Sequence, residues 1–272
     1  MIIDDIDFGV LYKAHLSLGQ RRHKTAGDWD SKSDRMAMDL GGMTDPYVKE
    51  FIDKMDLTDA QTLLDVGCGP GTICLPVAHR FKAVFGLDYS LGMLQRFQEV
   101  AQQKGIHHAQ CIHKAWEDDW GDVPECDIVV VSRATMVQDL EQAIEKLNSK
   151  AKMRVYTTHG VDGHFISEMI LNAIGRQSQG MPNYIYAVNI LQKMGYRPYV
   201  DYIDTPLNKP QPKTFEELLL SVEWSLGELN GDEQARLRHY FEEQTAKSLP
   251  VMKTSRAWAF VWWDVTLKHS QK

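Results

Sequence analysis

The sequence has few of the features that mark secreted, disulfide-bonded or membrane-spanning proteins. Four cysteines occur in 272 residues, Cys68, Cys74, Cys111 and Cys126, and none forms a Cys-x-x-Cys pair. This spacing suggests neither a disulfide framework nor a zinc knuckle, so we expect buried thiols in a reducing compartment. The acidic start, MIIDDIDFGV, lacks the basic stretch of a secretory signal. No apolar run reaches the roughly 20 residues that cross a bilayer, and we expect a cytoplasmic protein without a membrane partner.

Basic residues are also fewer than acidic residues. The chain has 30 Lys and Arg against 37 Asp and Glu, a formal net charge of -7. Proteins that grip phosphate backbones usually carry a basic face, because neutralised phosphates supply most of the affinity. This balance disfavours nucleic acid as a partner. The neighbouring His107, His108 and His113 have no cysteine or carboxylate at ligand spacing, so no metal site is predicted.

Short apolar runs alternate with amphipathic stretches between residues 62 and 159. The runs TLLDVG, KAVFGLD, AQCIH, CDIVVVS and MRVYTTH are typical of buried parallel strands. Helices are predicted between them, one over about 71–81 and another after Ser90. Later, YRPYVDYID and RAWAFVWWDV add two strands near 196–204 and 256–265. We therefore predict an α/β fold with a doubly wound, Rossmann-like seven-stranded sheet, mostly parallel with the last strand antiparallel.

The remaining segments are predicted to be helical covers of one domain overall. We divide the chain into a helical N-terminal segment (1–60), a core that contains most of the predicted strands (61–204), a helical insertion or lid (205–250) and a final strand (251–272). The first helix of the insertion starts at a capping box, Thr214 with Glu217. In the N-terminal segment, the predicted helix 4–18 places one set of side chains near a single face: Ile6, Val10, Leu11, Ala14 and Leu18. Specificity for the substrate is expected in these covers, with N-terminal candidates Tyr12, His15, Arg21, Arg22, His23 and Trp29.

The most informative motif is a glycine-rich turn between the first predicted strand and its helix. It reads Asp65-Val-Gly-Cys-Gly-Pro-Gly71. Glycines at 67, 69 and 71 allow a tight turn and close approach of a ligand to the backbone. Asp88 ends the next strand, about 20 residues after the first glycine, where an acid meets the hydroxyls of an adenosine ribose. The motif therefore predicts a nucleoside-binding site.

Two cofactor classes use such a turn. The dinucleotide fingerprint G-x-G-x-x-G requires a glycine where this chain has Thr72, and Asp65 would sit poorly beside a pyrophosphate. An acid there suits a cationic amino-acid group. With LLDVGCGPG as first motif and GLDYS as second, the sequence resembles the class I S-adenosylmethionine-dependent methyltransferases, over roughly 45–160 and the last two strands.

The resemblance implies a role for each motif residue toward S-adenosylmethionine, with S-adenosylhomocysteine as product. The glycine loop would line its methionine half, Asp65 would orient its ammonium, directly or through water, and Asp88 would take the ribose hydroxyls. Tyr89 would flank the adenine, which Trp116 and Glu117 of AWEDDW would also contact, with a register open by one residue. The full expected set is Asp65, Gly67, Cys68, Gly69, Pro70, Gly71, Asp88, Tyr89, Trp116, Glu117 and Ser132.

The acceptor is less defined. Strand four ends in SRAT, without the Asn/Asp-Pro-Pro-aromatic turn of base-amino methylases, which favours a small-molecule substrate. His159 is a candidate base or an ordinary loop histidine, Arg133 could bind a substrate carboxylate or pair with an acid, and Trp116 could be core. The alternatives are an RNA or protein methyltransferase, a nicotinamide-dependent oxidoreductase, and a non-catalytic donor-binding module.

Overall fold

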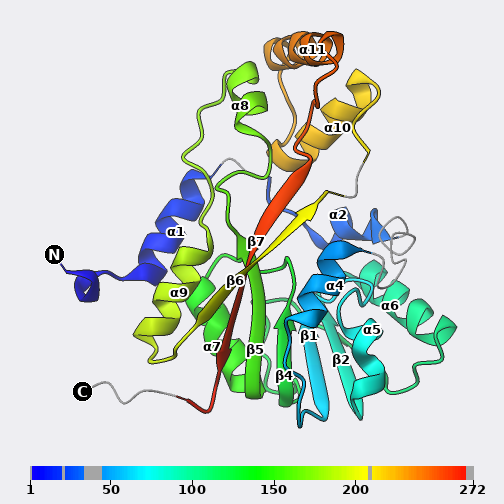
Figure 1. The fold of residues 1–272 in the computed structure, drawn as a ribbon, viewed down its shortest axis with the longest axis vertical. Coiled ribbons are helices and arrows are strands. Elements are labelled where there is room, and N and C mark those ends of the chain that lie inside the picture. Colours follow the sequence, from blue (N-terminus) through cyan, green and yellow to red (C-terminus); the bar gives the residue numbers. More distant parts are fainter. Residues whose placement is uncertain (1, 20–21, 34–44, 208–209, 268–272) are drawn as a thin grey trace.

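The computed structural model describes residues 2–19, 22–33, 45–207 and 210–267. Seven strands form one sheet in the order β3-β2-β1-β4-β5-β7-β6 (Figure 1). Strands β1 to β5 pair in parallel, whereas β7 pairs antiparallel with both β5 and β6, as predicted. The strands are β1 (Thr62–Val66), β2 (Ala83–Asp88), β3 (Ala109–His113), β4 (Cys126–Val131), β5 (Ala151–Gly160), β6 (Tyr199–Pro206) and β7 (Ser255–Asp264).

Helices begin where the sequence provides caps. The side chain of Asp45 accepts a hydrogen bond from Tyr47 N, and that of Thr214 accepts one from Glu217 N. The helices are α1 (Phe8–Leu18), α2 (Ala26–Asp30), α4 (Pro46–Asp53), α5 (Cys74–Val77), α6 (Leu91–Gln103), α7 (Leu140–Lys150), α8 (Glu168–Ile174), α9 (Tyr184–Lys193), α10 (Phe215–Leu226) and α11 (Gly231–Ala246), with 3-10 turns η1 (Ile3–Asp5) and η2 (Ala78–Arg80).

Helices cover both faces of the sheet. Successive residues of a strand point to opposite faces, so neighbours in sequence belong to different hydrophobic clusters. Leu63 belongs to the cluster formed with α4, α5 and α6, whereas its neighbour Leu64 belongs to the cluster formed with α1, α7 and α9. Figure 1 shows these two helical layers on either side of the strands. The result is a three-layer α/β core, with the carboxyl ends of β1 to β5 at one common edge.

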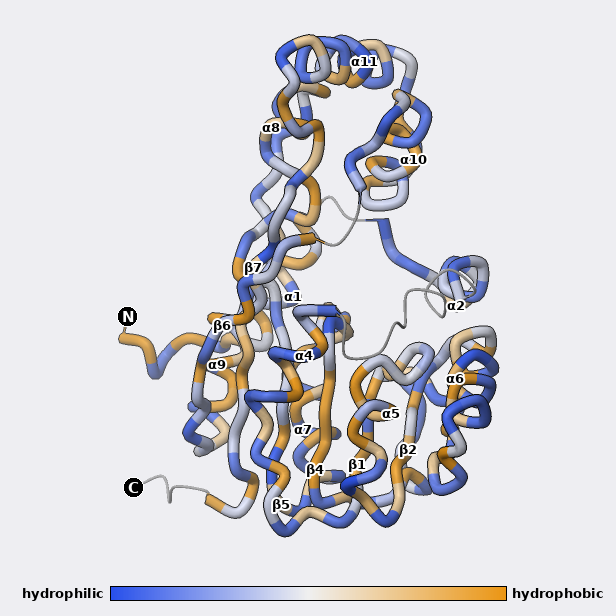
Figure 2. The backbone as a smooth tube through the Cα atoms, turned by 45° about the vertical axis from the view of Figure 1, so that its right-hand side comes forward, coloured by the Kyte–Doolittle hydropathy of each residue, from blue (hydrophilic) through white to orange (hydrophobic). Residues whose placement is uncertain are grey.

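A third hydrophobic cluster lies beyond that edge. It joins α8, α10 and α11 through buried residues such as Ile170, Leu218 and Leu237. Figures 1 and 2 show these three helices standing away from the main body of the sheet, past the end of β5. Arg176 links α8 to α11, since its Nε and Nη2 donate to the two carboxylate oxygens of Glu233 at 2.6 and 3.0 Å. We refer to α8, α10 and α11 as the helical cap.

Two local predictions were wrong. The helix predicted over 71–81 is replaced by a turn through Ile73, the four-residue α5 and the 3-10 turn η2. A helix starting at 71 would place Pro76 past its first turn, where proline lacks the required N–H and clashes with the preceding turn. Starting at Cys74 puts Pro76 in the first turn, where it is tolerated.

The predicted stripe of α1 was also wrong. Val10, Leu11 and Leu18 are 62%, 45% and 61% exposed, whereas Tyr12 is 2% exposed. The reason is tertiary, because the Tyr12 hydroxyl donates to Val137 O at 2.7 Å and its ring packs edge-on against Tyr186 of α9. Among the described residues, no helix combines the length and apolar character needed to cross a membrane.

Candidate functional site

The glycine-rich turn is tied to the end of the neighbouring strand. The N–H groups of Gly67 and Cys68 both donate to Leu87 O, at 2.7 and 3.1 Å, and Gly71 N donates to Cys68 O at 3.0 Å. All three glycines have positive φ, 67° at Gly67, 53° at Gly69 and 85° at Gly71. A Cβ is disfavoured in this left-handed conformation, so the loop needs glycine to hold its shape beside β2.

Only one of the three glycines faces open space. A Cβ on Gly67 would lie 2.5 Å from the Cβ of Ala134, and one on Gly71 would lie 2.5 Å from Leu75. A Cβ on Gly69 would meet nothing closer than the sulfur of Met93 at 3.9 Å. Protein packing therefore accounts for Gly67 and Gly71, while the backbone at Gly69 leaves room for a ligand. Cys68 and Pro70, between the glycines, are buried.

Asp88 stands directly beside Gly69. Its Oδ2 accepts a hydrogen bond from Gly69 N at 2.9 Å, and its Oδ1 accepts one from Ser90 N at 2.9 Å. The residue is 6% exposed, and burial raises the pKa of its carboxyl above the usual range. A carboxylate offers about four lone-pair positions, so both oxygens keep capacity for further donors. This arrangement fits the two hydroxyls of a ribose.

Asp65 lies behind the glycine loop at the end of β1. It is 1% exposed, and its Oδ2 accepts from Cys74 N at 3.3 Å. Burial, with a smaller contribution from the nearby Asp88 charge, raises the pKa of Asp65 to about 7. A bound cation would favour its charged form. Because the side chain is shielded from the surface, an ammonium group would reach it through a bridging water.

The N-terminal segment 22–33, which we call the strap, lies against the loop that follows Asp88. Asp30 Oδ1 accepts from Ser90 Oγ at 2.5 Å and from Gly92 N at 2.9 Å. The Tyr89 hydroxyl donates to Lys24 O at 3.3 Å. The strap therefore meets the start of α6 beside the expected ribose position, and Tyr89 is held by it.

The strap also reaches the helical cap. Arg22 N donates to Ser225 O at 2.9 Å, and Trp29 packs edge-to-face on Trp224 of α10 with ring centroids 5.8 Å apart. Figure 2 shows α2 between α6 and α10. The strap thus bridges two parts of the fold at the carboxyl edge of the sheet. Arg21, predicted beside it, lies outside the described residues.

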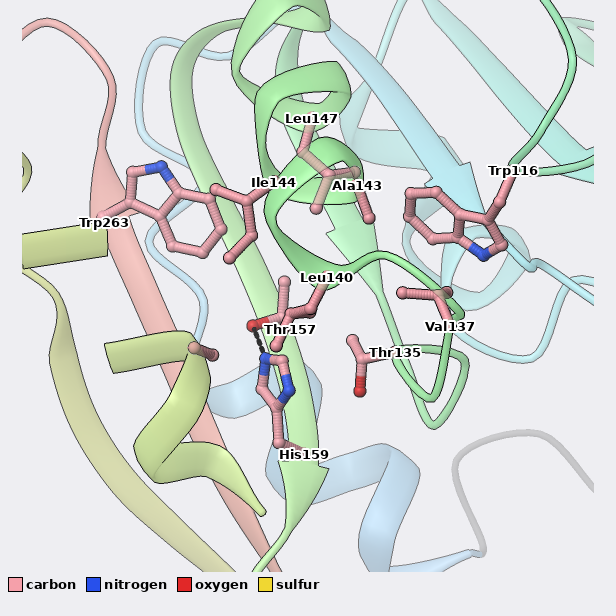
Figure 3. Close-up of a pocket in the computed structure, with 11 residues that line it drawn as sticks. Trp116, Thr135, Val137, Leu140, Ala143, Ile144, Leu147, Thr157, His159 and Trp263 are labelled. Atoms are coloured by element: carbon pink, nitrogen blue, oxygen red, sulfur yellow. Dashed lines mark hydrogen bonds between the residues drawn. The ribbon is translucent and has the colours of Figure 1, made fainter. Parts of the chain in front are cut away.

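The structure shows the surroundings of Trp116 and Glu117, which were expected to contact the adenine. Trp116 stacks on Trp120 with centroids 5.3 Å apart and lines a small cavity beside α7 (Figure 3). Glu117 is exposed, while the Asp118 carboxylate accepts from Ala115 N at 2.7 Å. These contacts favour a packing role for Trp116.

His159 lines the same cavity (Figure 3). Its Nε2 lies 2.9 Å from Thr157 Oγ1, and that hydroxyl donates to Val261 O at 3.0 Å. Because the single hydroxyl hydrogen is used at Val261, Nε2 must carry the hydrogen of a neutral imidazole. Burial lowers the pKa of His159 to about 3, far from the neutral pH at which a general base works best. The cavity, about 10 Å³, has room for no more than about one water and is too small for a substrate.

The end of β4 is joined to two residues that the sequence did not single out. The Tyr47 hydroxyl lies 2.8 Å from both Ser132 Oγ and Thr158 Oγ1. The Arg133 guanidinium lies 4.3 Å above the Tyr47 ring. Tyr47 follows a recognisable helix start at Asp45, yet nothing in the local pattern indicates that its hydroxyl points to the edge of the sheet.

Comparison with known proteins gives matches of different extent. A family model described as "Methyltransferase domain" matches residues 63–153. An uncharacterized protein of Haemophilus influenzae is 39% identical over 265 residues, which cover 97% of this chain and 99% of the relative. The 23S rRNA (uracil(1939)-C(5))-methyltransferase RlmD of Xylella fastidiosa is 26% identical over 84 residues, which cover 31% of this chain and only 19% of that enzyme.

The fold is also found among solved structures. The YcgJ protein from Bacillus subtilis superposes with a TM-score of 0.57 at 13% identity, covering 80% of this chain and 97% of the other. At this level of identity the similarity concerns the architecture alone. The family match, by contrast, covers β1 to the beginning of β5, with the glycine turn and Asp88 inside it.

Proposed function

Because the chain belongs to the class I S-adenosylmethionine-dependent methyltransferase family, we propose that it transfers the methyl group of S-adenosylmethionine to a small-molecule acceptor. The observation that carries the donor site is Asp88, whose two oxygens are held by Gly69 N and Ser90 N beside the open backbone of Gly69. A preorganised carboxylate next to an accessible glycine suits a ribose and the methionine part that is attached to it.

Three residues would each bind a different part of the donor. Asp88 accepts the ribose hydroxyls, Gly69 offers its open backbone, and Asp65 balances the ammonium through water. When bound, S-adenosylmethionine supplies an activated methyl group on a sulfonium. The protein then has to align the acceptor in line and exclude water. Burial lowers the pKa of His159 to about 3, so it is a weak proton acceptor, and we do not assign it as a base for this step.

The acceptor reaches the carboxyl edge under two covers. The strap and the helical cap meet there through Arg22 with Ser225 and Trp29 with Trp224. Two covers that contact each other at this edge favour a small molecule over a polynucleotide as acceptor. The net charge of -7 points the same way. The match to RlmD covers 31% of this chain, so it supports RNA as an acceptor less than it supports the shared methyltransferase core.

Two measurements test the proposal. Calorimetry should show binding of S-adenosylhomocysteine and none of NAD or NADP. A screen with methyl-labelled donor should then label a component of a small-molecule extract and leave an RNA pool unlabelled. Tight NAD binding without S-adenosylhomocysteine binding refutes the donor assignment. Labelled RNA with unlabelled small molecules refutes the acceptor class and leaves the donor assignment intact.

A further inference from the structure

The residue after the end of β4 is an arginine in an uncommon backbone conformation. Arg133 has φ 57°, and only Asp59 and Ser248 share a positive φ among the described non-glycine residues. A β-carbon disfavours this conformation. It is held here because Arg133 N donates to the buried Thr158 Oγ1 at 2.9 Å. Backbone strain of this kind is retained mainly where a side chain must be aimed for function.

The side chain that this backbone presents is cationic and unneutralised. The Arg133 guanidinium stacks 4.3 Å above the ring of Tyr47 and is exposed. Within the described part of the chain, no acidic side chain forms an ion pair with it. The chain has 37 acidic and 30 basic residues, so acids to pair with are plentiful. The second sequence-based alternative for Arg133, an ion pair with an acid, thus has no support in the described contacts.

The neighbouring Ser132 is left with a hydroxyl hydrogen to donate. Thr158 is fully buried, and its Oγ1 already accepts from Arg133 N, so its own hydrogen must go to its other neighbour, Tyr47 Oη, at 2.8 Å. Tyr47 has one hydrogen, which then goes to Ser132 Oγ at 2.8 Å. The chain of donors runs Thr158 to Tyr47 to Ser132. It ends at a half-buried hydroxyl whose hydrogen is available to a ligand.

Both donors lie beside the glycine loop. The residue after Arg133, Ala134, packs so closely on the loop that a Cβ on Gly67 would lie 2.5 Å from it. An arginine fork and a hydroxyl that both contact Tyr47 match the two oxygens of a carboxylate.

We propose that Ser132 and Arg133 form a carboxylate-binding pair at the carboxyl end of β4. This inference rests on the proposed function, since it places the pair beside the methyl-donor loop. A carboxylate can come from the methionine part of the donor or from the acceptor. The pair takes either, and the two sources are separated by the following experiment.

The first arm tests the donor. Binding of S-adenosylhomocysteine is compared with that of its decarboxylated analogue, in the native protein and in Arg133→Met, Ser132→Ala and the matched control Arg197→Met. Arg197 is another exposed arginine, located before β6. If the pair binds the donor carboxylate, Arg133→Met weakens S-adenosylhomocysteine at least about tenfold, as expected for one lost charge-assisted hydrogen bond. The analogue is bound equally by all four proteins.

The second arm tests the acceptor side. Acetate and succinate are titrated into the native protein, with and without S-adenosylhomocysteine, while the side-chain Nε–H signal of Arg133 is followed by NMR. If the acceptor supplies the carboxylate, this signal shifts saturably and Ser132→Ala weakens the carboxylate several-fold, while S-adenosylhomocysteine affinity is the same in all variants.

The pair is refuted if Arg133→Met changes neither the carboxylate-dependent part of S-adenosylhomocysteine binding nor the binding of simple carboxylates. That result leaves the proposed function standing as long as S-adenosylhomocysteine binds. If S-adenosylhomocysteine binds to no variant, the proposed function fails, and the titration without it still decides whether the pair binds carboxylates.

Discussion

Replacing Asp88 by alanine removes a carboxylate that serves both the fold and the proposed donor. In the ligand-free protein it accepts from Gly69 N and Ser90 N, each at 2.9 Å and each through a different oxygen. Both amides would lose their acceptor in a poorly hydrated region, since Asp88 is 6% exposed. Each orphaned buried N–H costs about 1–3 kcal/mol. Water that enters the new space recovers part of this cost.

The same carboxylate is expected to accept the ribose hydroxyls. A hydrogen bond to a charged acceptor contributes about 1.5–3 kcal/mol. Each 1.4 kcal/mol is about a tenfold change in the dissociation constant. Asp88→Ala should therefore weaken S-adenosylhomocysteine by at least about tenfold, in addition to lowering the free energy of unfolding.

A second carboxylate separates the two effects. Asp127, at the opposite edge of the sheet, accepts from Gln61 N at 2.7 Å and Thr62 N at 3.0 Å. Asp127→Ala removes a comparable pair of backbone contacts far from the glycine loop. Urea unfolding should show a loss of stability in both variants, whereas calorimetry should show weaker S-adenosylhomocysteine binding only in Asp88→Ala. If a folded Asp88→Ala binds the ligand as tightly as Asp127→Ala does, the ribose is held elsewhere.

Three further changes have expected outcomes. Asp65→Asn removes a group whose folded pKa, about 7, lies above its ordinary 3.8. The native protein should therefore lose stability relative to this variant as pH rises from 4 to 7, by up to about 1.4 kcal/mol per pH unit. If urea unfolding shows the same stability difference between the two proteins at every pH in this range, the burial argument is contradicted. Asp30→Ala frees Ser90 Oγ and Gly92 N, so hydrogen exchange should accelerate in residues 22–33 but not in α1; unchanged exchange would show that this carboxylate does not hold the strap. Arg176→Met leaves the 8% exposed Glu233 without its bidentate partner and should lower the unfolding free energy by about 1–3 kcal/mol at pH 7. This loss should become smaller at acidic pH, because Arg176 holds the pKa of Glu233 below its ordinary value. The exposed pair of Arg238 and Glu216, 3.8 Å apart, is its control, and equal losses in both would count against the cap contact.

Much of the sheet could be predicted because its information is local. Strand β4 is an apolar run that can be recognised from its own residues, and the glycine turn directly follows β1. Asp88 was placed by its distance along the chain from Gly67, since a strand–helix–strand unit fixes which residues end at the same edge. The structure brings Gly69 and Asp88 into direct contact, but the ligand that they bind remains a prediction.

Other features depend on surfaces that meet across long stretches of chain. Periodicity showed that α1 is a helix but gave the wrong buried face, because Tyr186 and Val137 decide which side packs. Helix α8 lies within the segment assigned to the core (61–204), but a hydrophobic cluster joins it to α10 and α11 of the insertion.

By itself, the sequence determined the α/β class, the order of the strands along the chain and the glycine turn with its two acids. These follow from apolar periodicity and from the few backbone conformations that glycine permits. Only the tertiary structure decided that, of the three loop glycines, Gly69 is the one that faces open space, that Trp116 stacks on Trp120, and that Tyr47 reaches Ser132 across 85 residues of chain. The physical reason is that a side chain's partner depends on which surfaces bury one another, and a local pattern specifies the face of an element without specifying what will cover it.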